Sequence, residues 1–276
     1  MNNTHPYPSL PQAWGIFGLF IAITVGVAFL LLIVSTITGF DNLPLVNLIG
    51  YTLSGILIIW YIHIRKKSAE PSEALIHFGT MPVSLTLLLL LITISVAVVI
   101  DPLTNLIPIP EFMEEVFETL LSKSPFNLIL VVLIGPVFEE ILLRGIILDG
   151  FLRRYSPVKS ILWSSFIFGL LHLNPWQFFG AFIAGLLMGY IYWKTRSLIA
   201  VIFIHMVNNG FGYVLSYIYG SDLVTLTNLF NNRRDYLIVY FASVVITVLL
   251  FLILHQIFSR QKEVIWKEYP PPHGDL

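Results

Sequence analysis

The sequence has no cysteine and few charged residues. Asp, Glu, Lys and Arg make up only 11% of its 276 residues, whereas soluble domains carry about 25%. Apolar residues account for 57%. A soluble chain of this length could not cover its surface with so few charges, so the composition indicates a polytopic membrane protein. The absence of cysteine excludes disulfides, thiolate catalysis and cysteine-based metal sites.

The charge balance gives no sign of a polyanionic partner. The formal net charge is −1 when the seven histidines are neutral. Nothing in this balance points to nucleic acid or to an anionic surface. We therefore expect no nucleic-acid partner, and we expect the lipid bilayer to be the main surroundings of the chain.

Apolar runs near the length that crosses a bilayer, about 20 residues, recur along the chain. They predict an all-α polytopic bundle of about eight transmembrane helices. The predicted helices cover residues 13–38, 44–64, 81–100, 126–152, 158–172, 176–194, 197–218 and 236–258.

Two further segments lie outside these runs. Between the third and fourth runs, the glutamates Glu111, Glu114, Glu115 and Glu118 recur at helical spacing opposite an apolar face. This pattern predicts a short amphipathic helix at the outer membrane interface. The Pro-rich stretch 266–276 is expected to be disordered.

The distribution of basic residues predicts the orientation. When the N-terminus is placed inside, most of the 15 lysine and arginine residues fall in segments on the cytoplasmic side. Basic residues concentrate on that side of membrane proteins. We therefore expect both termini in the cytoplasm, which requires an even number of crossings.

Apart from Ser and Thr, which can bond their own backbone, and histidines near helix ends, the polar side chains that call for a functional explanation fall in three of the predicted spans. Each is costly in a bilayer unless it is paired or hydrated, so such residues commonly serve a function. Glu140 and Arg144 stand four residues apart in the run 126–152, which favours an ion pair. Glu139 points about 100° away on the same helix and has no local partner. A helix-packing ion pair explains Glu140 and Arg144 but leaves Glu139 unexplained, and a free carboxylate suits a general base.

The other polar residues are imidazoles and amides. His205 and Asn209 stand four residues apart in the run 197–218, so both side chains face one direction. They form either a pair of hydrogen-bond donors for a ligand or a clamp between helices. His172 ends the run 158–172, where a lone histidine is commonly interfacial. Asn174 precedes Pro175, which is typical of a turn.

These residues resemble the motifs of a known family. EEILLR at residues 139–144 is similar to the EExxxR motif of the CAAX-protease and bacteriocin-processing (CPBP) intramembrane proteases. Residues 168–172 are similar to their FxxxH motif, and residues 205–209 to their HxxxN motif. The order and spacing agree with the family across residues 126–215. Each motif alone is weak, but three in order within membrane spans are specific.

The resemblance implies an intramembrane endopeptidase that uses water as its nucleophile. Glu139 and His172 would activate the water molecule, and His205 and Asn209 would hold the oxyanion of the tetrahedral intermediate. These roles agree with the residue types, because a desolvated carboxylate serves as a base and two donors make an oxyanion hole. The substrate would be a membrane-associated protein or peptide, prenylated or not. The family's many bacterial members lead us to expect a prokaryotic plasma membrane.

The resemblance also gives a supporting role to Glu140 and Arg144. It divides the chain into three parts. Residues 1–125 would hold the first three helices and the amphipathic helix, 126–218 the protease core, and 219–276 the last helix and the tail.

We expect catalysis without a bound metal or other cofactor. Zinc is the alternative, because Glu139, Glu140, His172 and His205 are all possible ligands. Against zinc, the two adjacent carboxylates diverge on their helix, and Glu140 is expected to pair with Arg144. The family is also often described as glutamate-type proteases.

Two other classes of function compete with a protease. A transporter also places charged residues at mid-membrane, but it should show inverted repeats and paired broken helices. The polar residues here lie in one half of the chain instead. A non-catalytic scaffold or immunity protein of the same fold would tolerate loss of a motif residue, whereas every motif residue is present.

Overall fold

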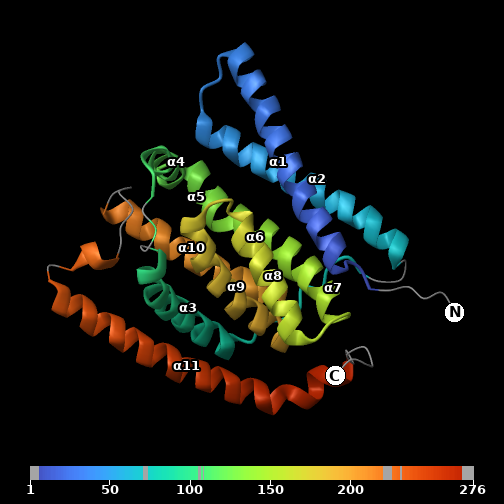
Figure 1. Cartoon of the computed structure of the whole chain (residues 1–276), viewed down its shortest axis with the longest axis vertical. Helices are drawn as coiled ribbons and strands as arrows, with labels where there is room; N and C mark the ends of the chain where they lie inside the picture. The colour runs from blue at the N-terminus through green and yellow to red at the C-terminus, as the bar shows by residue number, and fades with distance from the viewer. Residues whose placement is uncertain are drawn as a thin grey trace.

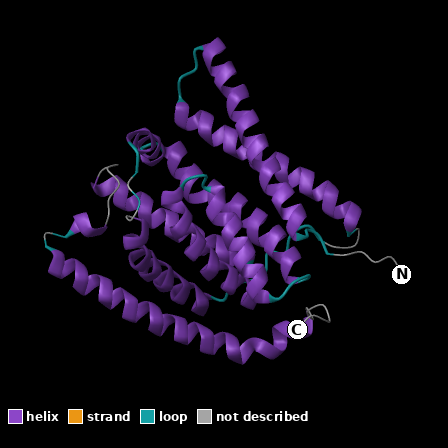
Figure 2. Cartoon of the chain, viewed as in Figure 1, coloured by secondary structure: helices purple, strands orange, loops and turns teal. Residues whose placement is uncertain are grey.

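A computed structural model gives the arrangement of most of the chain. It describes residues 6–70, 74–104, 107, 109–219, 226–230 and 232–268. Within these ranges the regular elements are all helices, joined by short loops (Figure 2). The predicted all-α class is confirmed. Residues 269–276, most of the stretch expected to be disordered, lie outside the described residues, and residues 266–268 are helical.

Each of the eight predicted apolar runs forms a helix or a continuous series of helices. Six of those in the described part of the chain are long and apolar enough to cross a membrane. These six are α1 (Leu10–Thr38), α2 (Leu43–Ala69), α3 (Val83–Thr104), the run from α5 to α7 (Pro125–Leu152), α10 (Leu198–Tyr219) and α11 (Arg233–Glu268). The other two are α8 (Pro157–Leu171), which is shorter, and α9 (Pro175–Thr195). The polytopic bundle is confirmed, and the chain is an integral membrane protein.

Two short helices complete the described part. The predicted amphipathic helix is present as α4 (Glu111–Leu121). Its acidic side chains are exposed, while Phe117 on the other face is buried. A 3-10 turn, η3 (Leu226–Leu229), precedes α11.

The helical run 125–152 is not a uniform α-helix. It consists of α5 (Pro125–Leu128), the π-helix η1 (Ile129–Ile134), α6 (Gly135–Glu140), the π-helix η2 (Ile141–Leu148) and α7 (Asp149–Leu152). The sequence predicted the run but not its π-helical turns, which are often found at functional sites. We call this run the central helix.

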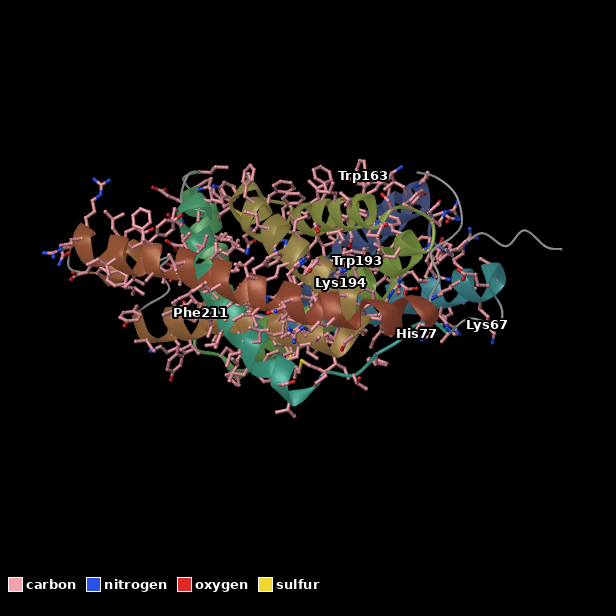
Figure 3. All side chains as sticks on the ribbon, turned by 90° about the horizontal axis from the view of Figure 1, so that it is seen from below. Lys67, His77, Trp163, Trp193, Lys194 and Phe211 are labelled. Atoms are coloured by element: carbon pink, nitrogen blue, oxygen red, sulfur yellow. The ribbon has the colours of Figure 1, made fainter. Side chains whose placement is uncertain are left out.

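The central helix lies inside the bundle, and other helices surround it (Figure 1). The helices α2, α8, α9 and α10 pack directly against it. On one side α1 packs on α2; on the other, α3 packs on α9 and α10, and α11 packs on α3. Figure 3 shows α3 and α11 crossing when the molecule is seen from below.

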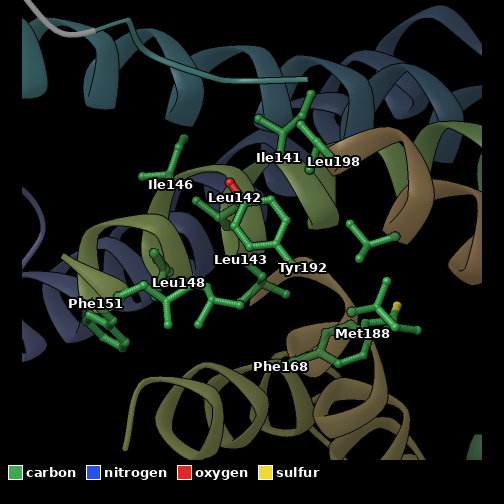
Figure 4. Close-up of a cluster of buried hydrophobic side chains, with 14 of the residues drawn as sticks. Ile141, Leu142, Leu143, Ile146, Leu148, Phe151, Phe168, Met188, Tyr192 and Leu198 are labelled. Atoms are coloured by element: carbon green, nitrogen blue, oxygen red, sulfur yellow. The ribbon is translucent and has the colours of Figure 1, made fainter. Parts of the chain in front are cut away.

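The apolar core forms around η2. Every residue of η2, from Ile141 to Leu148, is buried. Phe168 of α8 and Met188 and Tyr192 of α9 join this cluster (Figure 4). Close approach of α8 and α9 depends on small residues, because a Cβ at Gly185 would lie 3.0 Å from Ser165 Cβ. This packing holds the polar residues of the central helix against α8 and α10.

Candidate active site

Glu140 contacts residues of two of the three motifs. Its side chain is fully buried, and its Oε1 accepts a hydrogen bond from Arg144 NH1 at 2.8 Å. The same oxygen lies 2.8 Å from Nδ1 of His205 on α10. The Glu140–Arg144 ion pair that the spacing predicted is therefore present. It also binds a residue of another motif, 65 positions away.

Arg144 is enclosed by three helices. Its side chain is fully buried, and NH2 donates to the Gly185 carbonyl of α9 at 3.2 Å. Its Cζ lies 4.6 Å from the centre of the Phe168 ring of α8, a cation–π contact. Because the guanidinium is surrounded by protein, its charge is available to Glu140 and not to a substrate.

Glu139 lies beside this pair but has different partners. Its side chain is 17% exposed, and its Oε2 is 3.8 Å from His205 Nε2. Its Oε1 accepts a hydrogen bond of 2.7 Å from the hydroxyl of Tyr51 on α2. The sequence did not point to Tyr51, because a tyrosine in an apolar span is ordinarily a packing or interfacial residue. The one signal in the sequence that could have indicated Tyr51 is its hydroxyl within the predicted span 44–64, eight residues after the start of α2.

The two nitrogens of His205 serve different partners. An ionised carboxylate only accepts hydrogen bonds, so Nδ1 carries the proton that is donated to Glu140. His205 can therefore offer an Nε2–H only as the doubly protonated imidazolium.

His172 joins the cluster at the end of α8. Its Nδ1 lies 3.1 Å from the Phe168 carbonyl, which can only accept, so the proton is on Nδ1. The neutral ring then presents an unprotonated Nε2. The Phe168 ring contacts both imidazoles edge-on, with centroids 5.3 Å from His172 and 5.4 Å from His205. Phe168 thus spaces the two histidines.

Asn209 binds the backbone of the central helix. Its Nδ2 donates to the Val131 carbonyl of η1 at 2.9 Å. In the π-helical register Val131 would pair with residue 136, which is a proline without an N–H. The preceding carbonyl, Leu130, does receive the Gly135 N–H five residues on. Pro136 therefore frees the carbonyl that holds Asn209, and among the described residues the second amide hydrogen of Asn209 has no acceptor.

Two cavities adjoin these residues. One of about 310 Å³ is lined by motif residues of α8 and α10, including His172, His205 and Asn209, and by mainly apolar residues of α3, α9 and α10. The other, of about 540 Å³, lies among α1, α2, α4 and the start of the central helix, and Tyr51 lines it. The first cavity therefore adjoins the motif residues directly, whereas the second reaches the site only through Tyr51.

The zinc alternative finds little support in the side-chain arrangement. In the part of the chain that the structure describes, no group of three or more His, Cys, Asp or Glu side chains is placed to hold a metal ion. Glu140 Oε1 is already bound by Arg144 and His205. A cation at Glu140 would also face the guanidinium.

Comparison with known families agrees with these motifs. Residues 121–211 match the model of the family described as type II CAAX prenyl endopeptidase Rce1-like. This part of the chain, about a third of its length, is similar to that family. The resemblance to the CPBP proteases, inferred from three motifs, is thus confirmed. All seven motif residues lie inside the matched stretch, and Tyr51 lies outside it.

One relative extends the comparison. The "Putative membrane peptidase YdiL" of Bacillus subtilis (strain 168) is 28% identical over 95 residues. The match covers 34% of this chain and 39% of that relative, so it spans well under half of each. No solved structure matches the chain.

Proposed function

We propose that the chain is an intramembrane endopeptidase that hydrolyses a peptide bond of a membrane-associated protein or peptide. One observation carries the proposal. Glu139 Oε2 and His205 Nε2 come from different helices and face each other at 3.8 Å, beside a fully buried Glu140–Arg144 pair. The family match of residues 121–211 supports a peptidase over a transporter.

The distance between Glu139 and His205 suits a water molecule. It is too long for a direct hydrogen bond, yet a water oxygen beside the line between the atoms can lie about 2.8 Å from both. Glu139 takes a proton from this water as its oxygen attacks the scissile carbonyl carbon. The proton then passes to the leaving amine as the C–N bond breaks. The unprotonated Nε2 of His172 supplies a second acceptor for the water.

The negative charge of the intermediate falls on the former carbonyl oxygen. His205, as the imidazolium, donates Nε2–H to this oxygen, and Asn209 donates its second amide hydrogen. Glu140 and Arg144 support the site: Glu140 fixes the His205 ring through Nδ1, and Arg144 fixes Glu140. Neither of the two needs to touch the substrate.

The test is cleavage of defined peptides by the purified full-length protein in lipid nanodiscs. Matched prenylated and unprenylated membrane peptides are incubated with the wild type, Glu139→Gln and Glu118→Gln. Glu118 lies exposed on α4, so its variant makes the same chemical change away from the site. We expect cleavage by the wild type and Glu118→Gln only. Cleavage by Glu139→Gln at the wild-type rate would contradict the proposal. A cleavage rate that depends on the prenyl group would show that the protein recognises the lipid.

The proposed orientation places both termini in the cytoplasm. The beginning of α1 and the end of α11 lie toward the same side of the bundle, which supports an even number of crossings (Figure 1). The absence of native cysteine makes the test direct. Ser9→Cys and Ser259→Cys should react with an impermeant thiol reagent only in inside-out vesicles, and Ser122→Cys only in right-side-out vesicles. The opposite pattern would reverse the orientation.

A further inference from the structure

Tyr51 contacts Glu139, the proposed base, although it lies outside the part of the sequence that matches the family. It lies 88 residues before Glu139, on α2, and its hydroxyl donates to Glu139 Oε1 at 2.7 Å. We propose that Tyr51 is a positioning residue of the active site, which holds the Glu139 carboxylate so that Oε2 faces the attacking water. This inference rests on the proposed function.

The contact between α2 and the central helix is built by close packing on both sides of Tyr51. One turn further along α2, a Cβ at Gly55 would lie 2.6 Å from the ring of Phe138, the residue before Glu139. Only a glycine allows the two helices to approach so closely. From α1, the buried Phe20 packs edge-on against the Tyr51 ring, with centroids 6.2 Å apart. The backbone and the ring of Tyr51 are therefore both fixed.

The two adjacent glutamates receive different kinds of partner. Glu140 is paired with the Arg144 guanidinium, which neutralises its charge. Glu139 receives a neutral phenol, and among the described residues Tyr51 alone donates a hydrogen bond to its carboxylate. A neutral donor fixes the direction of a carboxylate while leaving it a net negative charge, as a base requires. This difference separates a supporting carboxylate from a reacting one.

Loss of the hydroxyl should leave Glu139 free to rotate about its terminal torsion, which has a broad preference. The carboxylate oxygen that meets the water would then be misplaced in much of the population. A misplacement of about 1 Å can reduce a rate by about a hundredfold. Binding of the substrate should change little, because Tyr51→Phe keeps the ring and the lost hydroxyl is bonded to Glu139.

The experiment compares Tyr51→Phe with the wild type on a peptide that the wild type cleaves and Glu139→Gln does not. We expect kcat to fall roughly ten- to hundredfold and KM to stay within about twofold. Tyr192→Phe is the matched control. Its hydroxyl lies 3.5 Å from the Asp149 carboxylate, further along the central helix and away from the motif residues. Its kcat should equal that of the wild type.

The outcomes separate this inference from the proposed function. An unchanged kcat in Tyr51→Phe, with Glu139→Gln inactive, overturns the role of Tyr51 alone. A lower melting temperature with unchanged kcat makes Tyr51 structural and also overturns it. An inactive wild type, or an active Glu139→Gln, overturns the proposed function and this inference with it. If Tyr51→Phe does not fold, Phe20→Leu replaces it in the experiment. This variant loosens the packing of the Tyr51 ring but keeps the hydroxyl, and an unchanged kcat of Phe20→Leu contradicts the inference.

Discussion

A hydrogen bond of 2.8 Å joins His205 Nδ1 to Glu140 Oε1, and the same oxygen accepts the guanidinium of Arg144 at 2.8 Å. One buried carboxylate thus connects the EExxxR motif to the HxxxN motif. Because both Glu140 and Arg144 have no exposed side-chain area, neither charge can be compensated by water. Removing one partner should therefore cost much more than removing both.

Arg144→Ala should unfold the protein rather than give a stable inactive enzyme. The expected loss is about 3–5 kcal/mol, the usual effect of leaving a buried charge without its partner. The measurement is the folded fraction in detergent and its thermal unfolding. Glu140→Leu combined with Arg144→Met removes both charges and should recover much of the stability. A well-folded Arg144→Ala with an altered pH–rate profile would instead place Arg144 in the chemistry.

Asn209→Ala should lower kcat by about 10²–10³, the usual effect of removing one oxyanion donor, and should change KM far less. It also removes the hydrogen bond to the Val131 carbonyl, worth about 1 kcal/mol of stability. Steady-state kinetics on a defined peptide separate the two parameters. Asn232→Ala, an exposed asparagine before α11, is the control and should keep wild-type kinetics. A change confined to KM would assign Asn209 to substrate binding.

The fold was largely predictable because membrane spans require long apolar runs. The predicted ends differ from those observed mostly by one to five residues, as with 44–64 against Leu43–Ala69. The largest difference is at the last helix, predicted to end at 258 and observed to Glu268. Its final turns are polar, so hydropathy could not reveal them.

The site was predictable only where the pairs lie on one helix. The Glu140–Arg144 pair follows from a spacing of four residues, and the structure shows it. The same spacing suggested that His205 and Asn209 act together, but their partners Glu140 and Val131 lie on another helix. Tyr51 and the π-helical turns escaped prediction because both depend on how separate helices meet. Contacts between separate helices leave no local pattern in a single sequence.

Gly55→Ala should reduce both stability and activity. The new methyl group would lie 2.6 Å from the Phe138 ring, and overpacking of this kind costs about 1–3 kcal/mol. Relief of the clash moves α2 away from the central helix, so kcat should fall as Tyr51 leaves Glu139. Gly18→Ala on α1 is the matched control, because a Cβ there meets nothing within 4 Å. Equal melting temperatures and kcat for both variants would contradict the close contact of α2 with Glu139.

Activity should survive removal of metal ions, because the strongest candidate ligands are already bound within the protein. Glu140 Oε1 accepts from Arg144 and His205, and Glu139 Oε1 accepts from Tyr51. The donor atoms that remain are Glu139 Oε2, the buried Glu140 Oε2 and one nitrogen each of His172 and His205. A dication among them would lie near the Arg144 guanidinium, which is unfavourable.

The measurement is elemental analysis of active protein after dialysis against a chelator, with the cleavage rate followed in parallel. We expect the wild-type rate with metal well below one equivalent per chain. Stoichiometric zinc, with activity lost on removal and restored on addition, would contradict this prediction. It would make Glu139 a metal ligand, with His172 and His205 completing a three-ligand catalytic site. In that case Tyr51 would orient a ligand rather than a base, and Tyr51→Phe would lower zinc affinity as well as kcat.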